Sequence, residues 1–112
     1  MRYLFLLWGD EAAEAALSAD ERRAIVVAHG EFFRRTSAGG REIAGEPLGP
    51  SRGGVVVRRR DGSYVDGPFL ETKEQLGGFY LIDCRDRDEA VALAKEIPAS
   101  PGLIVEIREI PG

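Results

Sequence analysis

Runs of apolar residues predict four strands along the chain. Residues 2–8 form an apolar run without alternation, which is the pattern of a strand that is buried on both faces. Residues 78–83 combine aromatic and β-branched side chains and predict a central strand. Residues 103–110 alternate between apolar and polar side chains, so this strand has one buried face. A short strand within residues 42–48 must lie at an edge or an end, because Pro47 cannot donate a backbone hydrogen bond.

A long helix is predicted between the first two strands. Residues 9–17 indicate a loop or a weak helical turn, and Ser18 and Glu21 then form a capping box. The helix continues for about five turns until Gly39-Gly40. One stripe of this helix carries residues at spacings of three and four, namely Ile25, Ala28, His29, Phe32 and Thr36. We expect this stripe to face the sheet.

A second helix is predicted over residues 86–97. Asp86 is a typical N-cap residue, and Glu89 follows three residues later, which is the spacing of a capping box. Pro98 ends the helix, because proline cannot continue the backbone hydrogen bonding.

Residues 55–66 predict a β-hairpin. Two strand-like segments flank Asp61-Gly62, a pair that favours a two-residue type I′ turn. The first segment ends in Arg58-Arg59-Arg60, the only basic run of the chain. On a strand these side chains alternate between faces. They either keep an edge strand from aggregating or, through Arg58 or Arg60, bind a phosphate or carboxylate.

The order of these elements predicts an α+β fold of the ferredoxin-like type, β-α-β-β-α-β, with a β-hairpin embellishment in the middle. Two helices can cover only one face of the sheet. The strand at residues 2–8 is apolar on both faces, so the uncovered face would expose a large apolar patch. We therefore expect a homodimer in which a second copy of the chain covers this face.

The composition fits a single domain over residues 1–112. No apolar run approaches the ~20 residues that span a bilayer, so we expect no membrane partner. The net charge of −4 argues against a nucleic-acid partner, which usually needs a clustered basic surface. The single cysteine, Cys84, excludes an internal disulfide and fits a cytoplasmic location. We expect Cys84 to be a buried or half-buried spectator.

The stretch DGPFLETKEQLGGFYLID at residues 66–83 combines a turn, a charged cluster and the predicted central strand. We expect Gly67 at positive φ, since Pro68 fixes its own φ and biases the preceding residue away from the helical region. Phe69 is predicted as a core residue rather than a stacking platform for a ligand. Glu71, Lys73 and Glu74 form a solvated or salt-bridged cluster, or else Glu71 or Lys73 contacts a ligand. A ligand site here would consist of Gly67, Pro68, Phe69, Glu71 and Lys73.

This stretch resembles the signature of the DGPF family, which belongs to the larger YCII-related superfamily. The opening YLFLLWGDE, the segment AGEPLGP at residues 44–50 and the closing helix and strand are also similar. The resemblance implies a ferredoxin-like domain that pairs into a dimeric α+β barrel with a cleft in each subunit. It also implies an active site formed by His29 and Asp66. DGPF-type proteins are associated with sigma factors of the extracytoplasmic-function class, which implies a sigma factor as a partner.

His29 and Asp66 each have two interpretations. His29, the only histidine, is either a satisfied core residue or an acid/base group, since histidine changes charge near neutral pH. Asp66 either caps the turn before Gly67-Pro68 or orients His29 as a carboxylate partner. As a catalytic pair the two would share one cleft, within reach of a direct or one-water hydrogen bond.

Two classes of function remain open. The first is a small enzyme that uses His29 and Asp66 for acid/base chemistry on a small organic substrate. The second is a non-catalytic ligand-binding or protein-interaction module linked to transcription regulation. One histidine and scattered carboxylates match no common metal-ligand spacing, so we expect no metal. No glycine-rich phosphate motif follows a strand and opens a helix, and we expect no cofactor.

Overall fold

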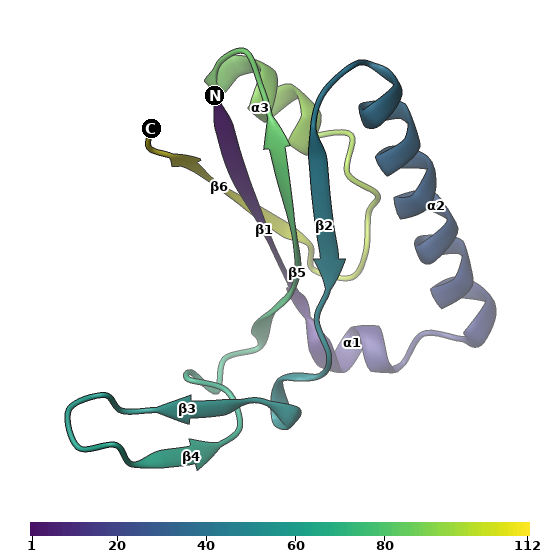
Figure 1. Ribbon diagram of the computed structural model, residues 1–112. Coiled ribbons are helices and arrows are strands. Elements are labelled where there is room, and N and C mark those ends of the chain that lie inside the picture. The colour runs from purple at the N-terminus through teal and green to yellow at the C-terminus, as the bar shows by residue number, and fades with distance from the viewer.

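A four-stranded antiparallel sheet forms the centre of the protein. The computed structural model describes residues 1–112 (Figure 1). The sheet contains β1 (Arg2–Asp10), β2 (Ile43–Pro47), β5 (Glu74–Asp83) and β6 (Ile104–Ile110). Their order is β2-β5-β1-β6, with antiparallel pairing throughout. β2 lies at an edge, as Pro47 predicts, and the arrangement is consistent with a ferredoxin-like α+β fold.

Three α-helices join these strands. They are α1 (Glu11–Ala15), α2 (Ala19–Ala38) and α3 (Arg87–Ala94). The short α1 occupies the segment for which the sequence left a loop or a weak helical turn open. No helix combines the length and the apolar character that a bilayer crossing needs.

The predicted capping box at the start of α2 is confirmed. The backbone N–H of Glu21 donates to Ser18 Oγ at 3.1 Å, and the backbone N–H of Ser18 donates to Glu21 Oε1 at 3.0 Å. The helix ends at Gly39, and Gly40 follows with a φ of +85°. The two ends of α2 therefore lie where local sequence places them.

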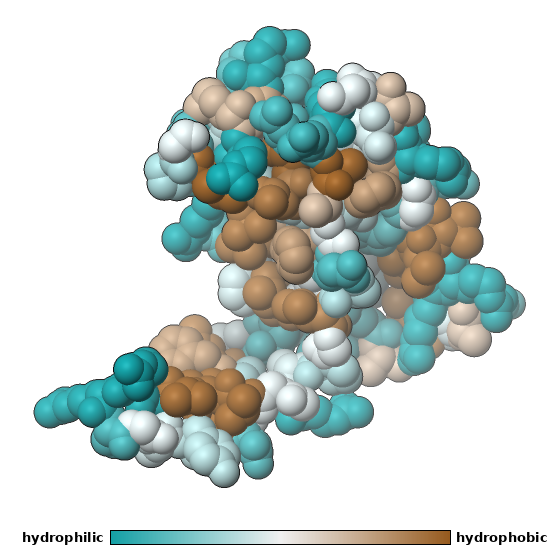
Figure 2. All heavy atoms as spheres, in the orientation of Figure 1, coloured by the Kyte–Doolittle hydropathy of each residue, from teal (hydrophilic) through white to brown (hydrophobic).

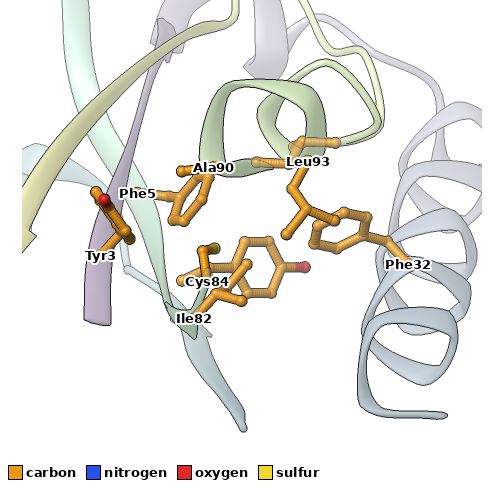
Figure 3. Packing of buried hydrophobic residues seen from close by; sticks show 9 residues of the cluster. Tyr3, Phe5, Phe32, Ile82, Cys84, Ala90 and Leu93 are labelled. Carbon is orange, nitrogen blue, oxygen red and sulfur yellow. The ribbon is translucent and has the colours of Figure 1, made fainter. Parts of the chain in front are cut away.

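The core lies between the sheet and the helices α2 and α3 (Figure 3). From the sheet it contains Tyr3, Phe5, Tyr80, Ile82 and Cys84, and from the helical side Phe32, Ala90, Leu93 and Ile97. Burial raises the pKa of the Cys84 thiol, which keeps it protonated at neutral pH. The prediction that Cys84 is buried is confirmed.

The opposite face of the sheet has no helix. Alternation along β1 places Leu4 and Leu6 on the face opposite the buried Tyr3 and Phe5. Ile104, at the start of β6, is exposed. Figure 2 shows apolar side chains spread across the sheet on the side towards the viewer, where α3 lies behind the strands. Apolar faces of this kind are common at interaction surfaces.

The hairpin forms, but its predicted turn is wrong. The strands β3 (Val55–Val57) and β4 (Tyr64–Asp66) contain three residues each. The loop between them is closed by two backbone bonds, from Arg58 N–H to the Ser63 carbonyl and from Gly62 N–H to the Arg58 carbonyl, both 2.8 Å. Only Gly62 has positive φ, whereas a type I′ turn needs two such residues.

The side chain of Asp61 explains the wider loop. Its Oδ1 accepts hydrogen bonds from the backbone N–H and the hydroxyl of Ser63, at 2.9 and 2.7 Å. This is a local cap of the kind that aspartate makes in turns, and it competes with the tighter turn. Consequently Arg58-Arg59-Arg60 lies in the loop and not on a strand.

The helix α3 is shorter than predicted and ends at Ala94. The next residues form a tighter turn, in which Glu96 N–H donates to the Leu93 carbonyl at 2.9 Å and Ile97 N–H donates to the Ala94 carbonyl at 3.3 Å. Pro98 disfavours helical geometry at the residue before it, so its effect extends back into the last turn. Ile97 nevertheless remains in the core.

Candidate functional site

A cavity of about 600 Å³ lies between α2 and the ends of β1, β2 and β5 nearest α1. Its apolar lining comes from Leu7, Trp8, Leu17, Ile25, Val26, Phe33, Phe79 and Leu103. Its polar lining comes from Glu14, Arg22, His29, Glu46, Tyr80 and Ser100. An apolar enclosure with few polar groups is typical of sites for small organic molecules.

A β-bulge and one glycine shape the strand side of the cavity. The register between β1 and β5 shifts between Leu7 and Trp8, and both residues line the cavity. Bulges of this kind occur beside binding sites, where they change the direction of a side chain. At Gly45 a Cβ atom would press against the ring of Tyr80 and lie 2.7 Å from the Phe79 carbonyl oxygen. The ring of Tyr80 occupies its place because residue 45 has no side chain.

His29 and Tyr80 form the polar pair of this cavity. His29 comes from the sheet-facing stripe of α2, and Tyr80 lies on the helix-facing side of β5. The distance from His29 Nδ1 to the Tyr80 hydroxyl is 2.8 Å. The two rings stack with their centroids 5.9 Å apart, and the ring of Phe32 packs against Tyr80 with a centroid distance of 5.1 Å. Helix and strand together therefore fix the orientation of the imidazole.

Burial sets the protonation of both groups. It lowers the pKa of His29 and raises the pKa of Tyr80, so both are neutral near neutral pH. Every fully buried side-chain nitrogen and oxygen in the protein has a hydrogen-bond partner. His29 Nε2 has no partner within the chain, so this nitrogen is not fully buried. This nitrogen is available to a bound molecule.

Glu14 places a second titratable group in the cavity wall. Burial, followed by the nearby charges of Glu11 and Asp10, raises the pKa of its carboxyl group. The carboxyl group leans over Gly9, where a Cβ atom would collide with it. A cavity with a histidine of lowered pKa and a carboxyl group of raised pKa suits proton transfer.

The residues predicted from the central stretch lie elsewhere. Asp66 is exposed on β4, has no hydrogen bond through its carboxylate and does not line the cavity. The chain by itself therefore does not bring Asp66 to His29. Gly67 has a φ of +105°, which confirms the predicted turn. That turn directs the chain along the hairpin side of the molecule and away from the cavity.

The predicted ligand-binding residues are also absent from the cavity lining, namely Gly67, Pro68, Phe69, Glu71 and Lys73. Phe69 is 74% exposed, so its prediction as a core residue is wrong. Glu71 is exposed, and the ammonium of Lys73 lies 3.5 Å from Asp10 Oδ2. The segment leaves the hairpin before β5 begins at Glu74, which keeps these side chains outside the core.

Sequence reasoning missed Tyr80 and Glu14. Tyr80 belongs to an apolar run that predicts only a strand, although it shares its face with the buried Ile82. A tyrosine predicted to be buried needs a partner for its hydroxyl group, and this rule could have pointed to His29 on the facing helix. Glu14 carries no local signal, because only the fold brings α1 to the cavity.

No three histidine, cysteine, aspartate or glutamate side chains are grouped closely enough to hold a metal ion. The site therefore consists of His29, Tyr80 and Glu14 in a mostly apolar wall.

Comparisons with known proteins agree with this architecture. A family model described as the YCII-related domain matches residues 1–111. The chain is 35% identical over 99 residues to an uncharacterized protein of Rhizobium meliloti (strain 1021), and this match covers 87% of the chain and 80% of that relative. Since the family model spans almost every residue, the chain belongs to the YCII-related family.

Proposed function

We propose that the protein binds a small, largely apolar organic molecule in the α2 cavity and uses His29 to transfer a proton to or from it. The observation that carries this proposal is the 2.8 Å contact between His29 Nδ1 and Tyr80 in the wall of a cavity of about 600 Å³. Cavities of roughly 300–1,000 Å³ accommodate most small ligands. A cavity of this size holds a molecule smaller than a dinucleotide cofactor.

Tyr80 would position His29 for this chemistry. When Nδ1 carries the imidazole proton and donates it to the Tyr80 hydroxyl oxygen, Nε2 is a free base directed at the ligand. The stacking of the two rings prevents the imidazole from turning. Glu14, with its raised pKa, supplies a second proton carrier in the cavity wall.

The homodimer also belongs to this proposal. The helix-free sheet face presents Leu4, Leu6 and Ile104, and a second copy of the chain would cover it. Within one subunit Asp66 does not line the cavity of His29. A His-Asp pair would therefore have to form between Asp66 of one copy and His29 of the other. Light scattering should give a mass of about 24 kDa, twice that of the 12.2 kDa chain. A mass near that of one chain at micromolar concentration would refute this part.

A non-catalytic ligand-binding module is the second candidate. It is favoured by the position of Asp66, which leaves His29 without a carboxylate partner in its own subunit. Association with a sigma factor stays a prediction within this second candidate. The same cavity serves both functions, so the two differ only in whether the bound molecule exchanges a proton.

Solvent deuterium exchange separates the two candidates. The protein is incubated in D₂O with a panel of small carbonyl compounds and carboxylic acids, and NMR follows both ligand binding and the loss of carbon-bound protons. An enzyme should exchange protons of at least one bound compound. The exchange rate should rise with pH and reach half of its plateau below pH 6.5, the ordinary pKa of histidine, because burial lowers the pKa of His29.

The decisive variant is His29→Asn, which keeps a polar group near the Nδ1 position but removes the base. It should reduce exchange by ~10² to 10⁴ while binding persists. Glu31→Gln is the matched control, since Glu31 is exposed on the same helix and does not line the cavity. Binding without exchange in the unmodified protein would establish the binding module instead.

A further inference from the structure

The arm, which we define as residues 51–66 with η1 (Ser51–Gly53), β3 and β4, is the least buried part of the protein. It projects away from the sheet and helices (Figure 1). Four of its apolar side chains are exposed to solvent, namely Val55, Val57, Tyr64 and Val65. Figure 2 shows a separate apolar patch over the arm, on the same side of the molecule as the apolar sheet face. A two-stranded sheet of this size is marginally stable in water without a covering surface.

Hydrogen bonds and an ion pair connect the root of the arm to the body, by which we mean the four-stranded sheet with α1, α2 and α3. The backbone N–H of Ser51 donates to Glu11 Oε2 at 2.9 Å, and the Ser51 hydroxyl donates to the other oxygen of that carboxylate. These bonds lower the pKa of Glu11, which keeps it charged. On the returning side, Lys73 pairs with Asp10, and Gly67 N–H donates to the Gly54 carbonyl at 2.7 Å.

Asp10 and Glu11, which are neighbours in the chain, thus contact both sides of the arm's root. Asp10 also caps α1, because its Oδ1 accepts from Ala13 N–H at 3.1 Å. The direction of the arm is therefore set by the body. A directed arm with an exposed apolar surface is what a contact with another molecule requires.

The charge of the arm points to its partner. Four arginines and two aspartates give the arm a net charge of +2, while the whole chain carries −4, so the remaining residues carry −6. None of the four arginines, Arg52, Arg58, Arg59 and Arg60, forms an ion pair within the chain. The opposite net charge is thus carried by the rest of this same protein. In a two-fold symmetric dimer each copy contributes the same two surfaces to the interface. A chain with a basic arm and an acidic remainder can therefore pair the arm of each copy with the other copy.

We propose that the arm of one copy lies across the body of a second copy, so that two arms clasp the homodimer. Val55, Val57 and Tyr64 share one face of the hairpin and pack on apolar surface that borders the partner's helix-free face, while the loop arginines lie among the partner's carboxylates. This inference rests on the homodimer of the proposed function, but it depends on neither His29 nor a ligand. A nucleic acid is the competing occupant of a basic arm, but it would leave the four apolar side chains uncovered.

Sedimentation equilibrium tests the clasp through two matched substitutions. Val57 on the arm and Val27 on the outer side of α2 are both 55% exposed. Val57→Asp should raise the dimer dissociation constant by about 100-fold or more, because each dimer would bury two new charges. Val27→Asp should leave the constant unchanged within about threefold. Equal effects of both, or a monomer in the unmodified protein, would overturn the clasp.

A second measurement uses the unmodified chain, so it stands even where Val57→Asp does not fold. Isotope-labelled and unlabelled protein are mixed, and intermolecular NOEs are recorded from the valine methyl groups. The clasp predicts NOEs to the unlabelled copy from Val55 and Val57, which share one face of the hairpin, and none from Val27. A dimer without NOEs from the arm would overturn the clasp and show that only the sheet face forms the interface. Arm amide shifts that change on addition of a DNA or RNA oligonucleotide, without such NOEs, would assign the arm to nucleic acid.

Discussion

The body and the arm contain similar side chains in opposite environments. Phe5 in β1 is fully buried, whereas Phe69, just after the arm, is 74% exposed. Tyr80 is covered by α2, whereas Tyr64 on the arm lies in solvent. β1 has a strand on each side and helices above it, while β3 has one partner strand and no covering layer. Burial is therefore decided by the number of layers that meet at a residue and not by how apolar it is.

Polar contacts differ between the two regions in the same way. In the body, His29 contacts Tyr80 and Arg41 contacts Glu89 across about 50 positions of the sequence. On the arm, Asp61 contacts Ser63 two positions away. Contacts between distant residues couple elements into one cooperative unit, while local contacts shape only a turn. The arm thus depends on its root and on whatever covers it.

Replacing Phe5 and Phe69 by alanine should give the largest difference in stability between the body and the arm side of the molecule. Phe5→Ala leaves a cavity in the core and should lower the free energy of unfolding by about 3–5 kcal/mol. Phe69→Ala should change it by less than about 0.5 kcal/mol. Urea unfolding followed by the fluorescence of Trp8, the only tryptophan, measures both. A large cost at Phe69 would show that this side chain is covered in the assembled protein.

Alanine substitutions at one glycine of the body and one glycine beside the arm should have intermediate effects on the free energy of unfolding. Gly45→Ala in β2 drives a methyl group into the ring of Tyr80 and should cost about 1–3 kcal/mol. Gly67→Ala has open space around it but a φ of +105°, and should cost about 1 kcal/mol through backbone strain alone.

Gly49 is the control for both, because a Cβ atom there meets nothing within 4 Å and its φ is not positive. The same urea experiment applies. Gly45→Ala should also raise the mobility of the His29 ring in NMR relaxation, whereas Gly67→Ala should not. A mobile His29 in both variants would mean that the arm and the cavity are coupled.

Gly30 tests whether α2 gives up helix stability to leave room in the cavity. It lies within α2 and lines the cavity, and a Cβ atom added at this position would meet nothing within 4 Å. Gly30→Ala should therefore stabilise the protein by about 0.5–1 kcal/mol through helix propensity. It should also weaken binding of the ligands found in the deuterium panel, since it narrows the cavity. Stabilisation with unchanged binding would place the ligand elsewhere.

Acid unfolding gives the smallest expected effect and compares two carboxylates. Hydrogen bonds from Arg41 and Arg85 lower the pKa of Glu89 to about 2, and those from Ser63 lower the pKa of Asp61. For a lowered pKa the unfolded chain binds the proton more readily, so stability is lost as pH falls from about 4.5 towards about 2 for Glu89. Glu89→Gln should flatten this loss in thermal melts at pH 3 and pH 6.

Asp61→Asn should leave the same melts unchanged, because its bonds close only the loop of the arm. Glu31→Gln, at an exposed position of α2, controls for the loss of one charge. An acid dependence that responds equally to Asp61 and Glu89 would mean that the arm unfolds together with the body. The thermal melt of the whole protein would then report on both regions.

Local sequence signals correctly predicted most of the fold. Ser18 and Glu21 begin α2, Asp86 begins α3, and Pro47 places β2 at an edge, because each acts on backbone groups within a few residues. The left-handed φ of Gly67 follows from the same local chemistry. The predictions were less accurate where two local signals compete. The Asp61 side chain favours a wider loop than the predicted turn, and α3 ends before the predicted residue.

The candidate site was only half determined by the sequence. The stripe on α2 predicts that His29 faces the sheet, because helical periodicity decides which side chains share a face. Its partner depends on which strand lies opposite, and only the tertiary structure brings Tyr80 to Nδ1 and Glu14 to the cavity wall. Asp66 and Phe69 show the converse, since their local motif is clear while their exposure depends on an arm that leaves the body. Short-range bonds let the sequence determine local geometry, whereas contacts between distant residues are decided by how the layers pack.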